Sequence, residues 1–173
     1  MLEVLSAYIV KKIKEADPDG DADPEVLNYE LGIRLNLYLT IMLTLILGFI
    51  CGDVLGSLLA FSGLALSRKF SGGWHMKSLT ACAVFSALLF AMIPMIHIND
   101  KITLILTGGC FVIFLLYSPN KFEELNRSKL DPYLKLISVF IVSLNFIIAS
   151  PILALAFTAQ AVSILPWKGG ERP

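Results

Sequence analysis

The chain has 173 residues, of which 56% are hydrophobic and only 16% are charged, and its formal net charge is zero. Its mean hydropathy is +0.74. Soluble domains carry about a quarter charged residues, so this composition excludes an ordinary soluble domain and indicates an integral membrane protein. The sequence holds no basic tract and no aromatic-basic pattern, so we expect no nucleic-acid partner.

Residues 1–16 predict an amphipathic helix. Leu2, Leu5, Ile9 and Ile13 fall close to one helical stripe, and three lysines decorate the rest. Two placements stay open: the helix lies in the membrane interface with its lysines toward acidic headgroups, or it packs on the protein's own cytosolic face. The basic residues follow the apolar ones, which is the reverse of the order in a cleavable signal.

An acidic turn comes next. Three alternating aspartates begin at position 17, but a calcium loop would need a glycine and a closing glutamate where Ala22 and Asn28 stand. We therefore predict a turn followed by a helix, with Asp23 as its cap and Pro24 at its first position. Neither a metal ion nor a cofactor is expected.

Six apolar runs follow and predict membrane-spanning helices. They lie at about 35–52, 53–67, 78–97, 102–118, 133–149 and 151–167. A hydrocarbon core of about 30 Å needs roughly 20 helical residues, so several of these runs are short. The predicted fold is an all-α polytopic membrane protein forming one domain over residues 1–173. It consists of the amphipathic helix 1–16, a helical membrane core 24–167 and a tail 168–173.

The basic residues predict the orientation in the cell membrane. With the N-terminus in the cytosol, every one of the 14 basic residues except Lys101 falls on the cytosolic side. Such an excess is typical of cytoplasmic loops. We therefore expect a multi-pass protein with both termini on the cytosolic side.

The stretch "LSRKFSGGWHMKSLTAC", residues 66–82, interrupts two apolar runs on that side. It holds His75 and Cys82, and a cysteine attacks as its thiolate, which a neighbouring imidazole can generate. Arg68, Lys69 and Lys77 would favour the thiolate further. The alternative is an interfacial histidine and a cysteine that only packs.

The spacing of this pair constrains the local structure. On one continuous helix, seven residues would separate the two side chains by about 10 Å along the axis, beyond the hydrogen-bond reach of about 3 Å. His75 must therefore lie off the helix that carries Cys82. The glycines of "SGGW" supply that freedom, and Ser78 is expected to cap the following helix.

The remaining candidates have simpler interpretations. Cys51 and Cys110 are assigned to packing inside apolar runs. His97, which follows the helix-kinking Pro94, is expected at the outer interface. A group of aromatic residues fits the belt at the cytosolic boundary: Trp74, Trp167 and Tyr117.

"RKFSGGWHMKSLTAC" resembles the reactive segment of the accessory gene regulator B (AgrB) family, the membrane peptidases of Gram-positive quorum sensing. Arg68, Gly73, His75 and Cys82 match the family's pattern in order and spacing. Two further stretches are similar to family segments: "YELGIRLNL" before the first span and "YSPNKFEELNRSKL", residues 117–130, in the basic loop.

The resemblance implies a cysteine endopeptidase, active on the cytosolic side, that cleaves a small AgrD-type propeptide and promotes its cyclisation to a thiolactone or lactone. Cys82 would be the nucleophile and His75 the general base and then acid. Arg68 would grip the substrate or anchor its span, and Gly73 would serve backbone geometry. Ser71 is a supporting candidate, and it shares the open third catalytic position with Glu30 and Asp53, although Asp53 is expected on the outer side.

The resemblance also implies partners. It predicts a homodimer, and small residues at Gly56 and Ala60 offer a contact for it. The loop 119–131 would either dock the substrate or form a solvated loop with local ion pairs. The lipid bilayer is the remaining partner.

Two other functions stay open. A non-catalytic membrane transport or accessory subunit is disfavoured because no charged residue lies in the middle of a predicted span. A relative that processes peptides for a purpose other than quorum sensing has the same sequence features.

Overall fold

The computed structural model describes residues 1–18, 22–74, 76, 78–120 and 133–165. Within these ranges the chain is helical, without a strand, so the predicted all-α class is confirmed. The elements are α1 (Leu2–Ala16), α2 (Pro24–Cys51), α3 (Val54–Ser71), α4 (Leu79–Met92), the short 3-10 turn η1 (Ile93–Met95), α5 (Asp100–Tyr117), α6 (Leu134–Ser143), α7 (Asn145–Ile148) and α8 (Pro151–Ile164).

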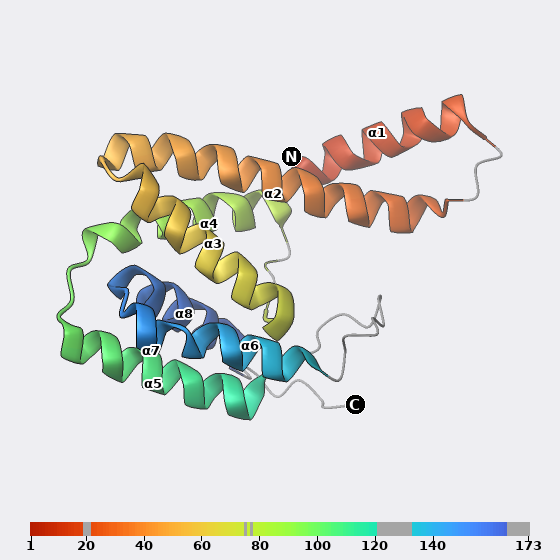
Figure 1. Ribbon diagram of the computed structural model, residues 1–173. Helices are drawn as coiled ribbons and strands as arrows, with labels where there is room; N and C mark the ends of the chain where they lie inside the picture. The colour runs from red at the N-terminus through yellow and green to blue at the C-terminus, as the bar shows by residue number, and fades with distance from the viewer. Residues whose placement is uncertain (19–21, 75, 77, 121–132, 166–173) are drawn as a thin grey trace.

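The helices form two groups that share α3 (Figure 1). On one side α2 packs along α4, and α1 lies against the first half of α2. On the other side α8 packs between α3 and α5, with α6 beside them. One core cluster joins α5, α6 and α8 around Phe114 and Phe157, and the second joins α3, α4 and α8 around Ala60 and Phe90. The helix α3 therefore connects both groups.

Capping residues set the helix starts as the sequence predicts. The Asp23 carboxylate accepts a hydrogen bond from the Glu25 amide at 2.8 Å, with Pro24 at the first helical position. Ser78 accepts from the Ala81 amide at 3.4 Å and begins α4. Such caps satisfy backbone N–H groups that have no partner within the helix. Both predicted caps are confirmed.

Only α2 and α5 among the described helices are long and apolar enough to cross a membrane alone. The 18 residues of α3 include serines and a basic last turn, which lower its hydropathy. At 1.5 Å per residue, the 14 residues of α8 extend about 21 Å, which is shorter than a core of about 30 Å. The six-span topology therefore stays a prediction.

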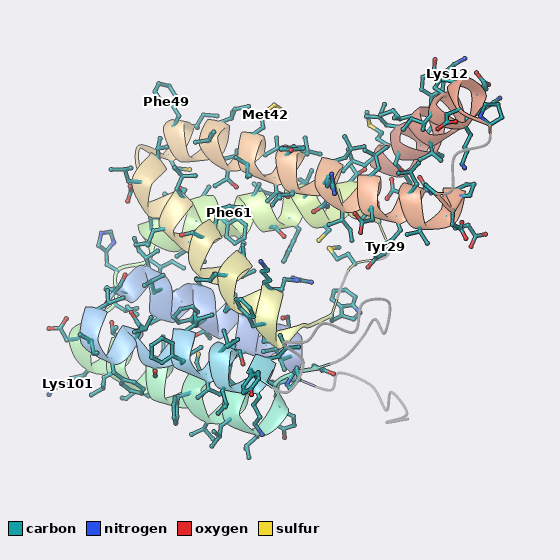
Figure 2. The ribbon with its side chains drawn as sticks, turned by 45° about the vertical axis from the view of Figure 1, so that its right-hand side comes forward. Lys12, Tyr29, Met42, Phe49, Phe61 and Lys101 are labelled. Atoms are coloured by element: carbon teal, nitrogen blue, oxygen red, sulfur yellow. The ribbon has the colours of Figure 1, made fainter. Side chains whose placement is uncertain are left out.

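The outer surface of the helices is nonetheless apolar. Figure 2 shows Met42 and Phe49 projecting away from the other helices, and their side chains are 52% and 79% exposed. Phe61 instead packs inward, edge-to-face on Phe90 with ring centroids 5.6 Å apart. Inside, the buried Asn145 amide donates to Thr107 at 2.9 Å and to the Ser150 carbonyl at 3.2 Å. Apolar residues outside with satisfied polar groups inside suit a lipid environment.

The buried face of α1 differs from the predicted stripe. Leu2, Ser6 and Val10 are buried, whereas Leu5 and Ile13 are 45% and 42% exposed. The reason is close helix packing: Ser6 Oγ lies 3.9 Å from where a Cβ would stand on Gly32 of α2. Small residues on both helices let them approach, so α1 packs on the protein and leaves an apolar face uncovered.

Three other expectations need correction or stay untested. Cys110 is buried in a core cluster as predicted, but Cys51 is exposed at the end of α2, so its assignment to packing is wrong. Gly56 and Ala60 are buried within the chain and cannot offer the predicted dimer contact. Most of the loop 119–131, the tail 168–173 and Trp167 lie outside the described residues.

Candidate functional site

The segment between α3 and α4 carries the predicted reactive residues. α3 ends at Ser71 and α4 begins at Leu79. His75 and Lys77 themselves lie outside the described residues. Cys82 is the fourth residue of α4, is half-buried, and its amide donates to the Ser78 carbonyl at 3.0 Å. The structure thus places Cys82 at the helix end that faces the glycine-containing segment.

Arg68 lies in the last turn of α3 and reaches this segment. Its Nη2 donates to the Trp74 carbonyl at 2.6 Å, and its buried Nε has no partner among the described groups. The guanidinium also interacts electrostatically with Cys82 on α4. This interaction links two helices, because Arg68 lies on α3 and Cys82 on α4.

Two glycines adopt backbone conformations that side chains rarely allow. Gly72 has a φ of +69° and Gly73 a φ of +137°. A Cβ on Gly72 would collide with the Asn120 carbonyl oxygen, and one on Gly73 would lie 2.7 Å from Ser163 Oγ. The backbone role predicted for Gly73 fits both its conformation and its contact.

The end of α8 holds the first part of the segment. The Gln160 side chain is fully buried, and its Nε2 donates to the Gly72 carbonyl at 2.6 Å and to Ser71 Oγ at 3.0 Å. The Trp74 amide donates to the Ser163 carbonyl at 3.0 Å. Four consecutive residues from Ser71 to Trp74 are therefore tied to α8 at both ends.

Asn120, which follows α5 in the chain, also holds this segment. Its backbone N–H donates to the Ser71 carbonyl at 2.8 Å, and its side-chain Nδ2 donates to the Ile164 carbonyl at 2.7 Å. A parallel backbone bridge also pairs it with Gly72. These bonds join α3, α8 and the chain after α5 at one point.

The second part of the segment is held by α1. Glu3 Oε1 accepts hydrogen bonds from the Leu79 amide at 2.7 Å and from Ser78 Oγ at 3.1 Å. The N-terminal ammonium lies 3.0 Å from Glu3 Oε2. The pKa of Glu3 is lowered to about 2, first by its own backbone N–H, then by the N-terminal ammonium and the Leu79 N–H. Glu3 therefore places a carboxylate at the start of α4, where helices favour negative charge.

The candidates for a third catalytic residue are occupied elsewhere. Ser71 is buried and bonds to Gln160 and Gly72. Glu30 pairs with Arg34 at 3.3 Å on the exposed side of α2. Asp53 caps the opposite end of α3, about 22 Å along the axis from Arg68. The structure gives none of the three a contact with Cys82.

No metal site accompanies this arrangement within the described ranges. Three or more His, Cys, Asp or Glu side chains do not gather there in a way that could hold a metal ion. A pocket of about 350 Å³ lies between α1 and the start of α2, lined by residues that include Val10, Lys11 and Asn28. It does not include Cys82, so we assign it no part in the chemistry.

Sequence reasoning missed Gln160 and Glu3. Gln160 carried a signal, because it is the only amide in the apolar run 151–165 and buried amides normally serve a hydrogen-bonded role. Glu3 carried none, because its partners on α4 are 75 and 76 residues away in the sequence.

Comparison with known proteins gives a family but no individual relative. No curated protein and no solved structure matches the chain. The sequence pattern of the family "Accessory gene regulator B" (AgrB) matches residues 4–168, nearly the whole chain and the whole segment described above. The chain therefore belongs to the AgrB family, which takes part in processing the AgrD propeptide of agr quorum sensing.

Proposed function

We propose that this protein is a membrane cysteine endopeptidase that cleaves an AgrD-type propeptide and promotes its cyclisation. The observation that carries the proposal is that Cys82 lies in the first turn of α4, directly after the segment from Ser71 to Trp74 that Gln160 and Arg68 hold. Reactive cysteines are commonly found at helix N-termini. His75, next to Trp74 in the chain, is the proposed general base.

The first step would be acyl transfer to the enzyme. His75 takes the Cys82 proton, and the thiolate attacks the backbone carbonyl at the end of the future signal peptide. As the C–N bond breaks, the imidazolium gives its proton to the leaving amine. The products are a thioester on Cys82 and a free C-terminal peptide.

The second step would close the ring. A cysteine or serine within the bound peptide attacks the thioester, giving its proton to His75, and the C–S bond to Cys82 breaks. Cys82 regains a proton, and the peptide leaves as a thiolactone or lactone. Exchange of one thioester for another changes the free energy little, so removal of the cleaved tail would draw the reaction forward.

We also propose six membrane crossings with both termini and the reaction in the cytosol. The basic residues support this arrangement, since Lys101 alone lies on the proposed outer side. Figure 2 shows Lys101 and Lys12 at opposite ends of the molecule.

Mass spectrometry of a co-expressed AgrD-type propeptide tests the proposal. We expect cleavage with the wild type and Cys110→Ala, and none with Cys82→Ala or His75→Ala. Cys110 is the matched control because it is a buried thiol on α5. An intact propeptide in all four would reject the peptidase and favour a non-catalytic membrane subunit.

A further inference from the structure

The last turns of α8 hold a buried polar side chain of which only one end is hydrogen-bonded. Gln160 is fully buried, and its Oε1 accepts no hydrogen bond from any described group. Burying an unpaired polar atom is unfavourable, and most neighbours of Gln160 along α8 are apolar. An apolar residue would remove that unpaired oxygen but also the donor that the other atom of the amide, Nε2, supplies.

Nε2, the other polar atom of the Gln160 amide, contacts the reactive segment beside its two positive-φ glycines. Nε2 donates to the Gly72 carbonyl and to Ser71 Oγ, and it would lie 3.1 Å from a Cβ on Gly73. Both glycines have positive φ values, so the chain direction there is set by outside contacts rather than by its own preferences. Gln160 supplies two of those contacts from a rigid, buried helix.

We propose that Gln160 is a positioning residue for the cysteine chemistry, because it sets the path of the chain through Gly72 and Gly73 towards Trp74. The inference rests on the proposed function, in which His75, the residue after Trp74, is the general base for Cys82. It acts through the backbone and does not touch the substrate. Trp74, the last described residue before position 75, is held by Ser163 and Arg68.

The test compares Gln160→Leu and Gln160→Glu with Thr158→Val on the same helix. Thr158 bonds to Cys110 and to the Ala154 carbonyl, so its variant removes a half-buried polar group from α8 without touching the segment. Gln160→Glu keeps the side chain's size, but a carboxylate cannot donate to the Gly72 carbonyl. Folding is checked by thermal unfolding in detergent.

We expect kcat for the propeptide to fall at least about tenfold in both Gln160 variants, with KM within about threefold. Thr158→Val should keep the wild-type kcat. The rate of Cys82 alkylation, followed by peptide mass spectrometry without substrate, should fall in the Gln160 variants alone. If Gln160→Leu does not fold, Gln160→Glu decides.

Three results would overturn the inference: an unchanged kcat in a folded Gln160 variant, a loss no larger than that of Thr158→Val, or a rise in KM with kcat preserved. If the wild type cleaves no propeptide, the proposed function fails by itself. The alkylation rates then decide separately, and equal rates in the wild type and Gln160→Leu would reject the positioning role.

Discussion

The two ends of the segment between α3 and α4 are held by different kinds of interaction. Residues 71–74 are tied to α8 by buried amide and backbone bonds, including those of Gln160 and Ser163. At the other end, Ser78 and Leu79 are held by the exposed carboxylate of Glu3 on α1. Buried bonds are insensitive to salt and pH, whereas an exposed carboxylate is sensitive to both.

The α8 end of the segment is therefore rigid, whereas the α1 end can be released. The α8 end is built into the core cluster that joins α5, α6 and α8, so moving it would disturb the fold. The α1 end depends on one side chain of a terminal helix. Damage to the buried end should therefore cost more activity than damage to the exposed end, and four predictions test that ranking.

The largest effect is expected from Gly73→Ala at the buried end. The φ of +137° disfavours alanine, and the new Cβ would lie 2.7 Å from Ser163 Oγ. Displacement of the segment should lower kcat by about 100-fold. Gly52→Ala is the matched control, because Gly52 has a φ of +84° but nothing within 4 Å. The control should lose about 1–2 kcal/mol of stability and keep its kcat; equal activity losses would contradict the ranking.

Arg68→Gln should have the second largest effect. It removes the positive charge near Cys82 and the bond from Nη2 to the Trp74 carbonyl. Hydrogen bonds from charged groups contribute about 1.5–3 kcal/mol, so we expect kcat to fall roughly tenfold or more.

Arg34→Gln provides the comparison, since it removes an arginine whose ion pair with Glu30 is exposed. Exposed pairs contribute at most about 1 kcal/mol, so its activity should stay close to wild type. A wild-type kcat in Arg68→Gln would show that the contact does not support the reaction.

Glu3→Gln should have a smaller effect at the exposed end. The amide can still accept from the Leu79 amide but no longer places a negative charge at the start of α4. We expect kcat to fall by about threefold, with faster hydrogen exchange of the Leu79 amide. Glu15→Gln, which breaks only the exposed pair with Lys12 at the far end of α1, should change neither. A loss as large as that of Gly73→Ala would reverse the ranking.

The smallest effect is a pH dependence of the exposed end. The pKa of Glu3 is about 2, below its ordinary 4.5. The carboxylate's contribution to stability is therefore complete above about pH 4.5 and is lost as the pH falls through about 2. The difference in melting temperature between wild type and Glu3→Gln should shrink over this window. A difference that stays constant down to pH 2 would contradict the assignment.

Much of the fold was predictable because its signals are local. Asp23, Pro24 and Ser78 marked helix starts, since capping depends only on residues within one turn. The apolar runs likewise predicted the helices, although α6 and α7 divide one run. The spacing from His75 to Cys82 required the helix that carries Cys82 to begin after position 75, and α4 begins at Leu79.

The failures involve packing between helices. The buried face of α1, the exposed Cys51 and the buried Gly56 and Ala60 all depend on which helix lies alongside. A small residue suits a dimer contact and an intramolecular contact equally well. The sequence therefore could not decide between them.

The sequence by itself determined the helical class, most helix boundaries and the cluster of reactive residue types from Arg68 to Cys82, because periodicity, capping and motif spacing are properties of neighbouring residues. Only the tertiary structure decided what holds that cluster. Gln160 lies 88 and 89 residues from its partners, and Glu3 lies 75 and 76 residues from two of its own. Contacts over such separations follow from how whole helices pack, which no local pattern encodes.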